Sequence, residues 1–211
     1  MDNQSLVEQA KERARSNLKE KGLGSRATVV NTIWELLETD IPPEVVVKVN
    51  GALEGFFAGT GLMGSACGFL ALCLGTIGMI YGGKGLVYDG SSPGWGVEAF
   101  QGSLGQLLRD TELPPEEKAQ KYLDMIKPFA IYNQMTNRFK KRFGSINCLD
   151  LIRPWATDPI TIDWFRNCET IIVETTGIAM ELILEARENG LSSFEIEGNM
   201  FATLFPNLRG E

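Results

Sequence analysis

Four cysteines carry the distinctive chemistry of this 211-residue chain, because it contains no histidine. Without imidazole there is no Ser-His-Asp triad, no histidine-ligated zinc and no histidine-ligated haem, and a C-x-x-C-H attachment site for haem c is excluded as well. No two cysteines are spaced as C-x-x-C, which excludes the patterns of zinc ribbons, thioredoxins and ferredoxins. The chemistry that remains belongs to thiols, carboxylates, hydroxyls and the backbone. The four cysteines are Cys67, Cys73, Cys148 and Cys168.

Cys148 has the local sequence that most favours a reactive thiol. Ser145 or Asn147 can cap a short helix over residues 148–152, which would place Cys148 in its first turn. The positive end of the helix dipole lowers the pKa of a thiol at that position. Inert burial of Cys148 is an equal alternative. Cys168 lies in the middle of a predicted helix, where a core position is favoured.

Cys67 lies at the edge of a stripe of small residues on a predicted helix over residues 66–81. At 100° per residue the stripe collects residues that fall on one side of the helix, namely Gly64, Gly68, Ala71, Gly75 and Gly78. Small residues let another backbone or a flat ligand approach the helix axis. The stripe therefore indicates either tight helix packing or a cofactor cavity. Cys73 faces nearly away from it and is expected to be a small buried residue.

Helical periodicity and capping signals run through most of the chain. They predict helices over residues 3–21, 25–37, 115–143 and 163–189, with a further helix start at Pro42–Pro43 and a kink at Pro128. No repeat and no shift in composition marks a domain boundary. The sequence therefore predicts a single compact all-α domain over residues 1–211, with the glycine-rich helix buried at its centre.

Charge and hydropathy limit the partners and the compartment. The chain has 20 Lys and Arg against 27 Asp and Glu, which argues against nucleic acid as a partner. A charged N-terminal segment and too few cysteines for a disulfide scaffold predict a cytoplasmic protein. No residue from Gly55 to Gly83 is charged. Glycines interrupt the first part, however, which leaves about 16 helical residues where a spanning helix needs roughly 20. We expect a buried helix without membrane insertion.

Taken together, the cysteine contexts resemble a known family. Residues 55–61 (GFFAGTG) look like its GFGGGxG segment, residues 67–71 (CGFLA) its CGAxxGA helix, residues 142–151 (RFGSINCLDL) its FGSxxCRELL stretch, and Asn167-Cys168 its last cysteine helix. The family is the redox-active one named for the pattern C_GCAxxG_C_C, which is related to part of the split-Soret cytochromes. The resemblance covers about residues 24–185 and leaves 186–211 as a C-terminal tail.

The resemblance implies a redox site on Cys67, Cys148 and Cys168, which would hold an iron–sulfur cluster or another metal, with Gly64 and Gly68 beside the cofactor. Two departures affect this site. Arg26 stands where the first cysteine of the family is expected, and Leu72 replaces the second glycine of the motif. Arginine cannot be a metal ligand, so a carboxylate, water or a small ligand would complete the site. The absence of histidine excludes the haem-binding part of a split-Soret protein.

Three functions follow from these patterns. The first is electron transfer to a redox partner through an iron–sulfur cluster or another metal on the three cysteines. The second is metal-free thiol–disulfide chemistry with Cys148 as the catalytic nucleophile. The third is a non-enzymatic binding or dimerising module that has lost its redox site. The small-residue stripe and the resemblance also predict a homodimer. We expect Cys67, Cys148 and Cys168 to converge, Cys73 to stay apart, and Arg26 to approach the same pocket.

Overall fold

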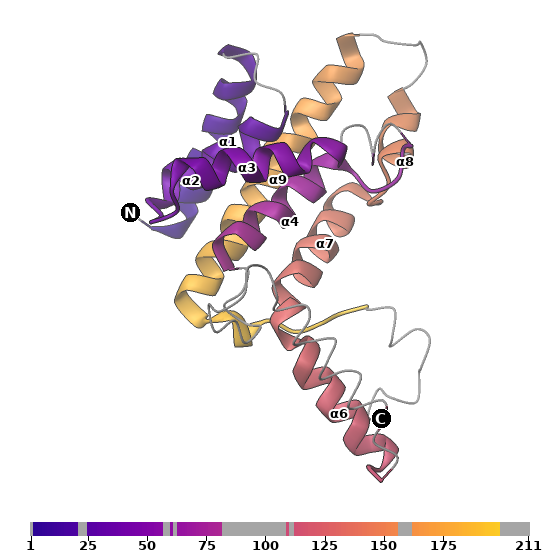
Figure 1. Ribbon diagram of the computed structural model, residues 1–211. Helices are drawn as coiled ribbons and strands as arrows, with labels where there is room; N and C mark the ends of the chain where they lie inside the picture. Colours follow the sequence, from indigo (N-terminus) through magenta and orange to yellow (C-terminus); the bar gives the residue numbers. More distant parts are fainter. Residues whose placement is uncertain are drawn as a thin grey trace.

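The computed structural model describes residues 2–20, 25–56, 60, 63–81, 109, 112–155 and 162–198. Within these ranges the regular elements are helices, as Figure 1 shows, and the all-α prediction is confirmed. The α-helices are α1 (Asn3–Glu20), α2 (Ser25–Leu37), α3 (Pro43–Ala52), α4 (Gly68–Tyr81), α6 (Pro115–Ile126), α7 (Ala130–Phe143), α8 (Cys148–Ile152) and α9 (Ile162–Asn189). Short 3-10 helices are η1 (Leu53–Phe56), η2 (Lys127–Phe129), η3 (Arg153–Trp155) and η4 (Leu191–Ser193).

Proline and glycine set several helix boundaries, as the sequence predicts. Pro43 opens α3, where its missing N–H would have no intrahelical partner. The predicted kink at Pro128 is the 3-10 turn η2 between α6 and α7. Gly144 ends α7 in the left-handed conformation with a φ of 85°, and its N–H donates to the carbonyl of Lys140 at 2.8 Å. The end of α7 at Gly144 leads directly into the segment that carries Cys148.

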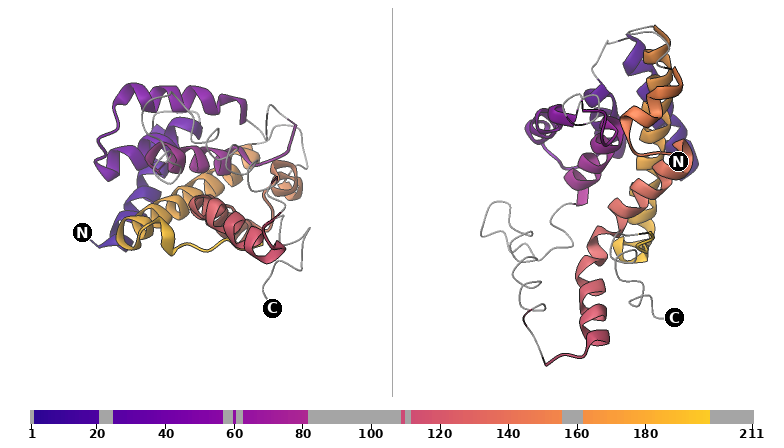
Figure 2. Two further views of the ribbon diagram at one scale, coloured as in Figure 1. Left: turned by 60° about the horizontal axis from the view of Figure 1, so that its bottom comes forward. Right: turned by 90° about the vertical axis from the view of Figure 1, so that its right-hand side faces the viewer.

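The long helix α9 lies at the centre of the packing, because α1, α2, α4 and α7 all contact it. Figures 1 and 2 show these helices grouped along α9, with α6 extending beyond them. Helix α4 is deeply buried, which explains why it carries no charge. Its buried residues are Leu70, Ala71, Leu72, Cys73, Thr76, Ile77 and Ile80. Among the described helices, none is both long and apolar enough to cross a membrane.

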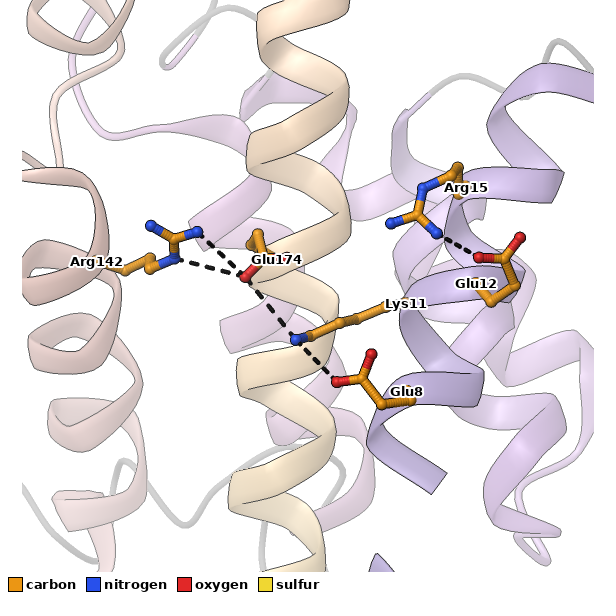
Figure 3. A network of polar contacts seen from close by, with 6 residues as sticks. All are labelled: Glu8, Lys11, Glu12, Arg15, Arg142 and Glu174. Atoms are coloured by element: carbon orange, nitrogen blue, oxygen red, sulfur yellow. Dashed lines mark hydrogen bonds and ion pairs between the residues drawn. The ribbon is translucent and has the colours of Figure 1, made fainter. Parts of the chain in front are cut away.

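Ion pairs on the surface of the bundle fasten α1 and α7 to α9. Glu174 of α9 lies between Arg142 of α7, at 3.5 Å, and Lys11 of α1, at 3.9 Å (Figure 3). A Cβ atom on Gly177 would lie only 2.4 Å from Cε of Lys11, so glycine at this position lets the lysine stem cross α9. Arg142 is in the last turn of α7 and therefore anchors the helix just before the Cys148 segment.

The segment after α9 returns to α7. Phe194 is buried, and both the backbone N–H and the backbone carbonyl of Glu197 hydrogen-bond to the side chain of Asn133. The side-chain amide of Asn133 donates to the Glu197 carbonyl at 2.9 Å and its oxygen accepts from the Glu197 N–H at 2.8 Å. Gln134 donates in the same way to the Glu195 carbonyl at 2.8 Å. The first part of the predicted C-terminal tail is therefore bonded to the helical bundle through Glu197.

Candidate functional site

The segments that carry Cys67 and Cys148 lie side by side. An isolated antiparallel β-bridge pairs Ala66 with Asn147. Two short backbone hydrogen bonds close this bridge, from the Cys67 N–H to the carbonyl of Ile146 (2.7 Å) and from the Cys148 N–H to the carbonyl of Ser65 (2.6 Å). Because side chains alternate along extended backbone, Cys67 and Cys148 lie on the same side of the bridge as diagonal neighbours. The bridge thus joins two cysteines that are far apart in the sequence.

Gly64 turns the chain into this bridge. Its φ is 69°, in the left-handed region that side chains disfavour, and a Cβ atom there would lie 3.0 Å from the Cβ atom of Leu149. Its carbonyl accepts the N–H of Leu149 at 2.9 Å. The prediction that Gly64 lies on the helical stripe is wrong, since it occupies a bend before α4; cofactor binding by Gly64 stays a prediction. Gly68, the second predicted cofactor-binding glycine, is the first residue of α4.

Cys67 occupies the position directly before α4 and caps that helix. Its carbonyl accepts the Ala71 N–H at 3.1 Å, and the backbone N–H groups of Leu70 and Phe69 hydrogen-bond to its sulfur. Ser, Thr, Asp or Asn more often has this role. The pKa of Cys67 is raised to about 11, because the effect of burial, together with that of negative charge on Cys148, exceeds the lowering by the two N–H groups. The helix that we expected to begin at residue 66 therefore begins after Cys67.

Cys148 is the first residue of α8, in the first turn of a short helix as predicted. Of the two alternatives for Cys148, a lowered pKa and burial, the structure favours burial, which raises the pKa of this half-buried thiol. Helix α8 has five residues and a correspondingly weak dipole. In addition, the N–H groups of Cys148 and Leu149 are already bonded to the carbonyls of Ser65 and Gly64. Little of the positive helix end is left to stabilise a thiolate.

Cys168 belongs to α9 and brings a third thiol to the same place. Its pKa is raised to about 12, mostly by burial and in smaller part by negative charge on Cys148 and on Cys67. Such an influence weakens with distance and with screening by water, and it links Cys73 to Cys67 as well. The structure therefore places the thiols of Cys67, Cys148 and Cys168 within electrostatic reach of one another, although each comes from a different part of the chain.

Cys73 lies deeper in the molecule. It is fully buried, and its thiol donates to the carbonyl of Thr175 in α9 at 3.5 Å. Burial raises its pKa well above the ordinary value, and negative charge on Cys67 adds to this effect. The prediction that Cys73 is a small buried residue is confirmed. This hydrogen bond holds the thiol of Cys73 at the interface between α4 and α9.

The thiols do not form a ready-made metal site. In the part of the chain that the structure describes, no three Cys, His, Asp or Glu side chains are placed to hold a metal ion. Thiolates that share a metal lie roughly 4 Å apart, given a metal–sulfur distance of about 2.3 Å. The donor set in this structure therefore does not fit a cluster without movement of the side chains. The side chain of Arg26, which we expected near this pocket, lies outside the described residues.

The rest of the small-residue stripe packs against the chain's own side chains. A Cβ atom on Gly75 would lie 2.6 Å from Cδ1 of Leu53, and one on Gly78 would lie 3.7 Å from the hydroxyl of Tyr132. These contacts favour tight helix packing over a cofactor cavity at this level of α4. They also cover part of the stripe on which the homodimer prediction rests, and the homodimer stays a prediction.

Asp150, to which no sequence motif assigned a role, holds the turn before α8 together through its carboxylate. The hydroxyl of Ser145 donates to Oδ2 of Asp150 at 3.0 Å, and the side-chain amide of Asn147 donates to the same oxygen at 3.2 Å. The Asn147 N–H in turn donates to the Ser145 hydroxyl at 3.1 Å. A signal for this turn exists in the sequence, since Asn147 and Asp150 have the three-residue spacing of a capping box.

Comparison with known proteins gives one finding on the family. A family model described as "Putative redox-active protein (C_GCAxxG_C_C)" matches residues 27–182, a range that includes all four cysteines. No curated protein and no solved structure matches the chain.

Proposed function

Because the chain belongs to the C_GCAxxG_C_C family of redox-active proteins, we propose that it exchanges electrons through a dithiol–disulfide couple formed by Cys148 and Cys67. The observation that carries this proposal is the bridge between Ala66 and Asn147, which fixes the backbones of the two cysteines beside each other. Such a couple needs no metal. It therefore agrees with thiols that are electrostatically coupled but, among the described residues, are not placed to hold an ion.

In the proposed reaction Cys148 is the nucleophile, since it is half-buried and Cys67 is only 4% exposed. The thiolate of Cys148 attacks a sulfur of a disulfide substrate, forms a mixed disulfide with it, and releases the other substrate sulfur as a thiolate that takes up a proton. The thiolate of Cys67 then attacks the sulfur of Cys148 and releases the second substrate thiol. The substrate gains two electrons and the chain ends as a Cys67–Cys148 disulfide.

The geometry of the bridge sets how far the backbone must move in this step. Diagonal neighbours across an antiparallel pair have Cα atoms roughly 7–8 Å apart, whereas a disulfide joins Cα atoms about 4.4–6.8 Å apart. Closing the disulfide therefore needs the Cys148 segment to approach by between a few tenths of an ångström and about 3.6 Å. Helix α8 is short and lies at the surface, so it can make this movement while α4 stays packed.

The second candidate is the iron–sulfur centre that the sequence predicts, with Cys67, Cys148 and Cys168 as ligands and electron transfer as the function. One observation favours a site of three thiols over a pair. Negative charge on either of the other two cysteines, Cys67 or Cys148, raises the pKa of Cys168. Thiolates are the ligands that iron–sulfur clusters prefer. A carboxylate, water or a small ligand would complete the site, and the three thiols would have to move closer together.

Matched cysteine-to-serine variants separate the two candidates. The dithiol couple predicts that Cys67→Ser loses the intramolecular disulfide, measured by mass spectrometry after equilibration with glutathione buffers, whereas Cys168→Ser keeps it. A metal centre predicts that both variants lose iron, sulfide and absorbance between about 320 and 450 nm after anaerobic purification. Serine at position 67 can still cap α4, and Cys73→Ser is the control that should change neither property. The dithiol proposal is wrong if the wild-type protein forms no Cys67–Cys148 disulfide.

A further inference from the structure

We propose that Asp150 is a positioning residue that holds Cys148 against the Cys67 segment. The inference rests on the proposed dithiol function and names a residue that this function requires. Asp150 lies two positions after Cys148 and on the surface, with 45% of its side chain exposed. It acts on the thiol through Ser145 and Asn147, whose side chains it binds.

The hydrogen bonds around Asp150 close residues 145–150 into a ring. A single carboxylate oxygen, Oδ2, accepts from both Ser145 and Asn147, and the Ser145 hydroxyl also accepts the N–H of Asn147. Hydrogen bonds to an ionised carboxylate are stronger than those between neutral groups. The charge of Asp150 is therefore suited to fix two polar side chains at once on an exposed turn.

Backbone groups of this ring hydrogen-bond to the segment before α4. The carbonyl of Ile146 and the N–H groups of Cys148 and Leu149 all point across the bridge, where they bond to Cys67, Ser65 and Gly64. Asn147 lies at the position that would cap α8, but its side chain makes no capping hydrogen bond and reaches Asp150 instead. Asn147 thus leaves the N–H of Leu149 free for the carbonyl of Gly64.

Loss of Asp150 would remove this restraint on Asn147. Its amide could then turn toward the N–H groups of its own helix, as asparagine does at most helix starts, and compete with the carbonyls of Gly64 and Ser65. The bridge would open more often, which would separate Cys148 from Cys67 and expose the buried thiol. The ion pair of Asp150 with Arg153, at 3.9 Å between exposed side chains, adds little to the restraint.

The test uses the full chain and two readouts. In glutathione buffers, Asp150→Ala lowers the equilibrium constant for the Cys67–Cys148 disulfide by about fivefold to tenfold, the ratio expected from losing a capping interaction. In the reduced protein, Asp150→Ala raises the alkylation rate of Cys67 by a similar factor and leaves that of Cys73 unchanged. Asp150→Asn keeps one acceptor oxygen and recovers part of both effects, and Arg153→Ala is the control that stays near wild type.

The alkylation readout keeps the two proposals separable. A wild-type chain that forms no Cys67–Cys148 disulfide overturns the dithiol function, while faster alkylation of Cys67 alone in Asp150→Ala still supports the positioning role. An unchanged alkylation rate of Cys67 in Asp150→Ala overturns the positioning role. Equal acceleration at Cys67 and Cys73 also overturns it, because Asp150 would then contribute only to global stability.

Discussion

Two cysteines six positions apart, Cys67 directly before α4 and Cys73 in the middle of it, have different surroundings. Directly before the helix, Cys67 is held by backbone hydrogen bonds to a second segment, the one that carries Cys148, and its thiol is electrostatically coupled to Cys148 and Cys168. In the middle of the helix, Cys73 is packed into the interface with α9 and bonded to the carbonyl of Thr175. Both thiols are buried and both have raised pKa values. The difference shows that burial alone does not make a thiol site; a partner thiol held in place by the backbone is also needed.

The largest effect on stability is expected in the middle of α4. Ile77 is fully buried there, and Ile77→Ala should lower the free energy of unfolding by about 2–5 kcal/mol, since the cavity adds to the lost transfer free energy. Urea denaturation measures this change. Cys67 lies directly before α4 rather than in its middle. We therefore expect the Cys67–Cys148 disulfide to form in Ile77→Ala under conditions in which this variant is folded. A variant that is folded but cannot form the disulfide would contradict the distinction.

Alkaline pH should lower the free energy of unfolding, because the thiol of Cys67, directly before α4, resists ionisation in the folded chain. Cys67 has an ordinary pKa of 9.0 when unfolded and about 11 when folded, so the folded chain keeps this proton while the unfolded chain loses it. The stabilisation is complete below pH 9 and is lost as the pH rises toward 11, by about 2–3 kcal/mol for this thiol. Cys168 acts in the same direction. Urea denaturation at pH 8 and pH 11 should show a smaller loss in Cys67→Ser than in the wild type.

Gly64→Ala should disturb the bridge by a smaller amount. A side chain in the left-handed region costs about 1–2 kcal/mol, and the new methyl group would press against Leu149. We expect a lower melting temperature together with faster alkylation of Cys67. Gly55→Ala is a useful control, because nothing lies within 4 Å of its Cβ position. Equal effects of the two substitutions would show that the bridge does not depend on glycine at position 64.

The smallest effect is expected from the surface pair of Lys19 and Glu169, which lies beside Cys168. The two charges are 3.9 Å apart, and the lysine side chain is 63% exposed. Lys19→Ala should therefore change the free energy of unfolding by less than about 1 kcal/mol and leave the alkylation rate of Cys168 near that of the wild type. A clear rise in that rate would show that α1 shields the third thiol more than the geometry indicates.

Much of the helical framework follows from the sequence itself. The predicted boundaries of α2 (Ser25–Leu37) and α8 (Cys148–Ile152), the interruption at Pro128 and the helix end at residue 143 all agree with the structure. These features depend on residues within a few positions of one another, through capping, proline sterics and helical periodicity. The sequence also predicted that Cys73 would be a small buried residue, because helical phase is a local property.

The arrangement around the thiols was decided by tertiary structure. The bridge between Ala66 and Asn147, the left-handed bend at Gly64 and the capping of α4 by Cys67 all depend on a segment that is distant in the sequence. The raised pKa of Cys148 likewise comes from burial, which depends on distant parts of the chain. Local pattern fixes where helices begin and end, but the environment of a thiol is the sum of contacts that only the folded chain brings together.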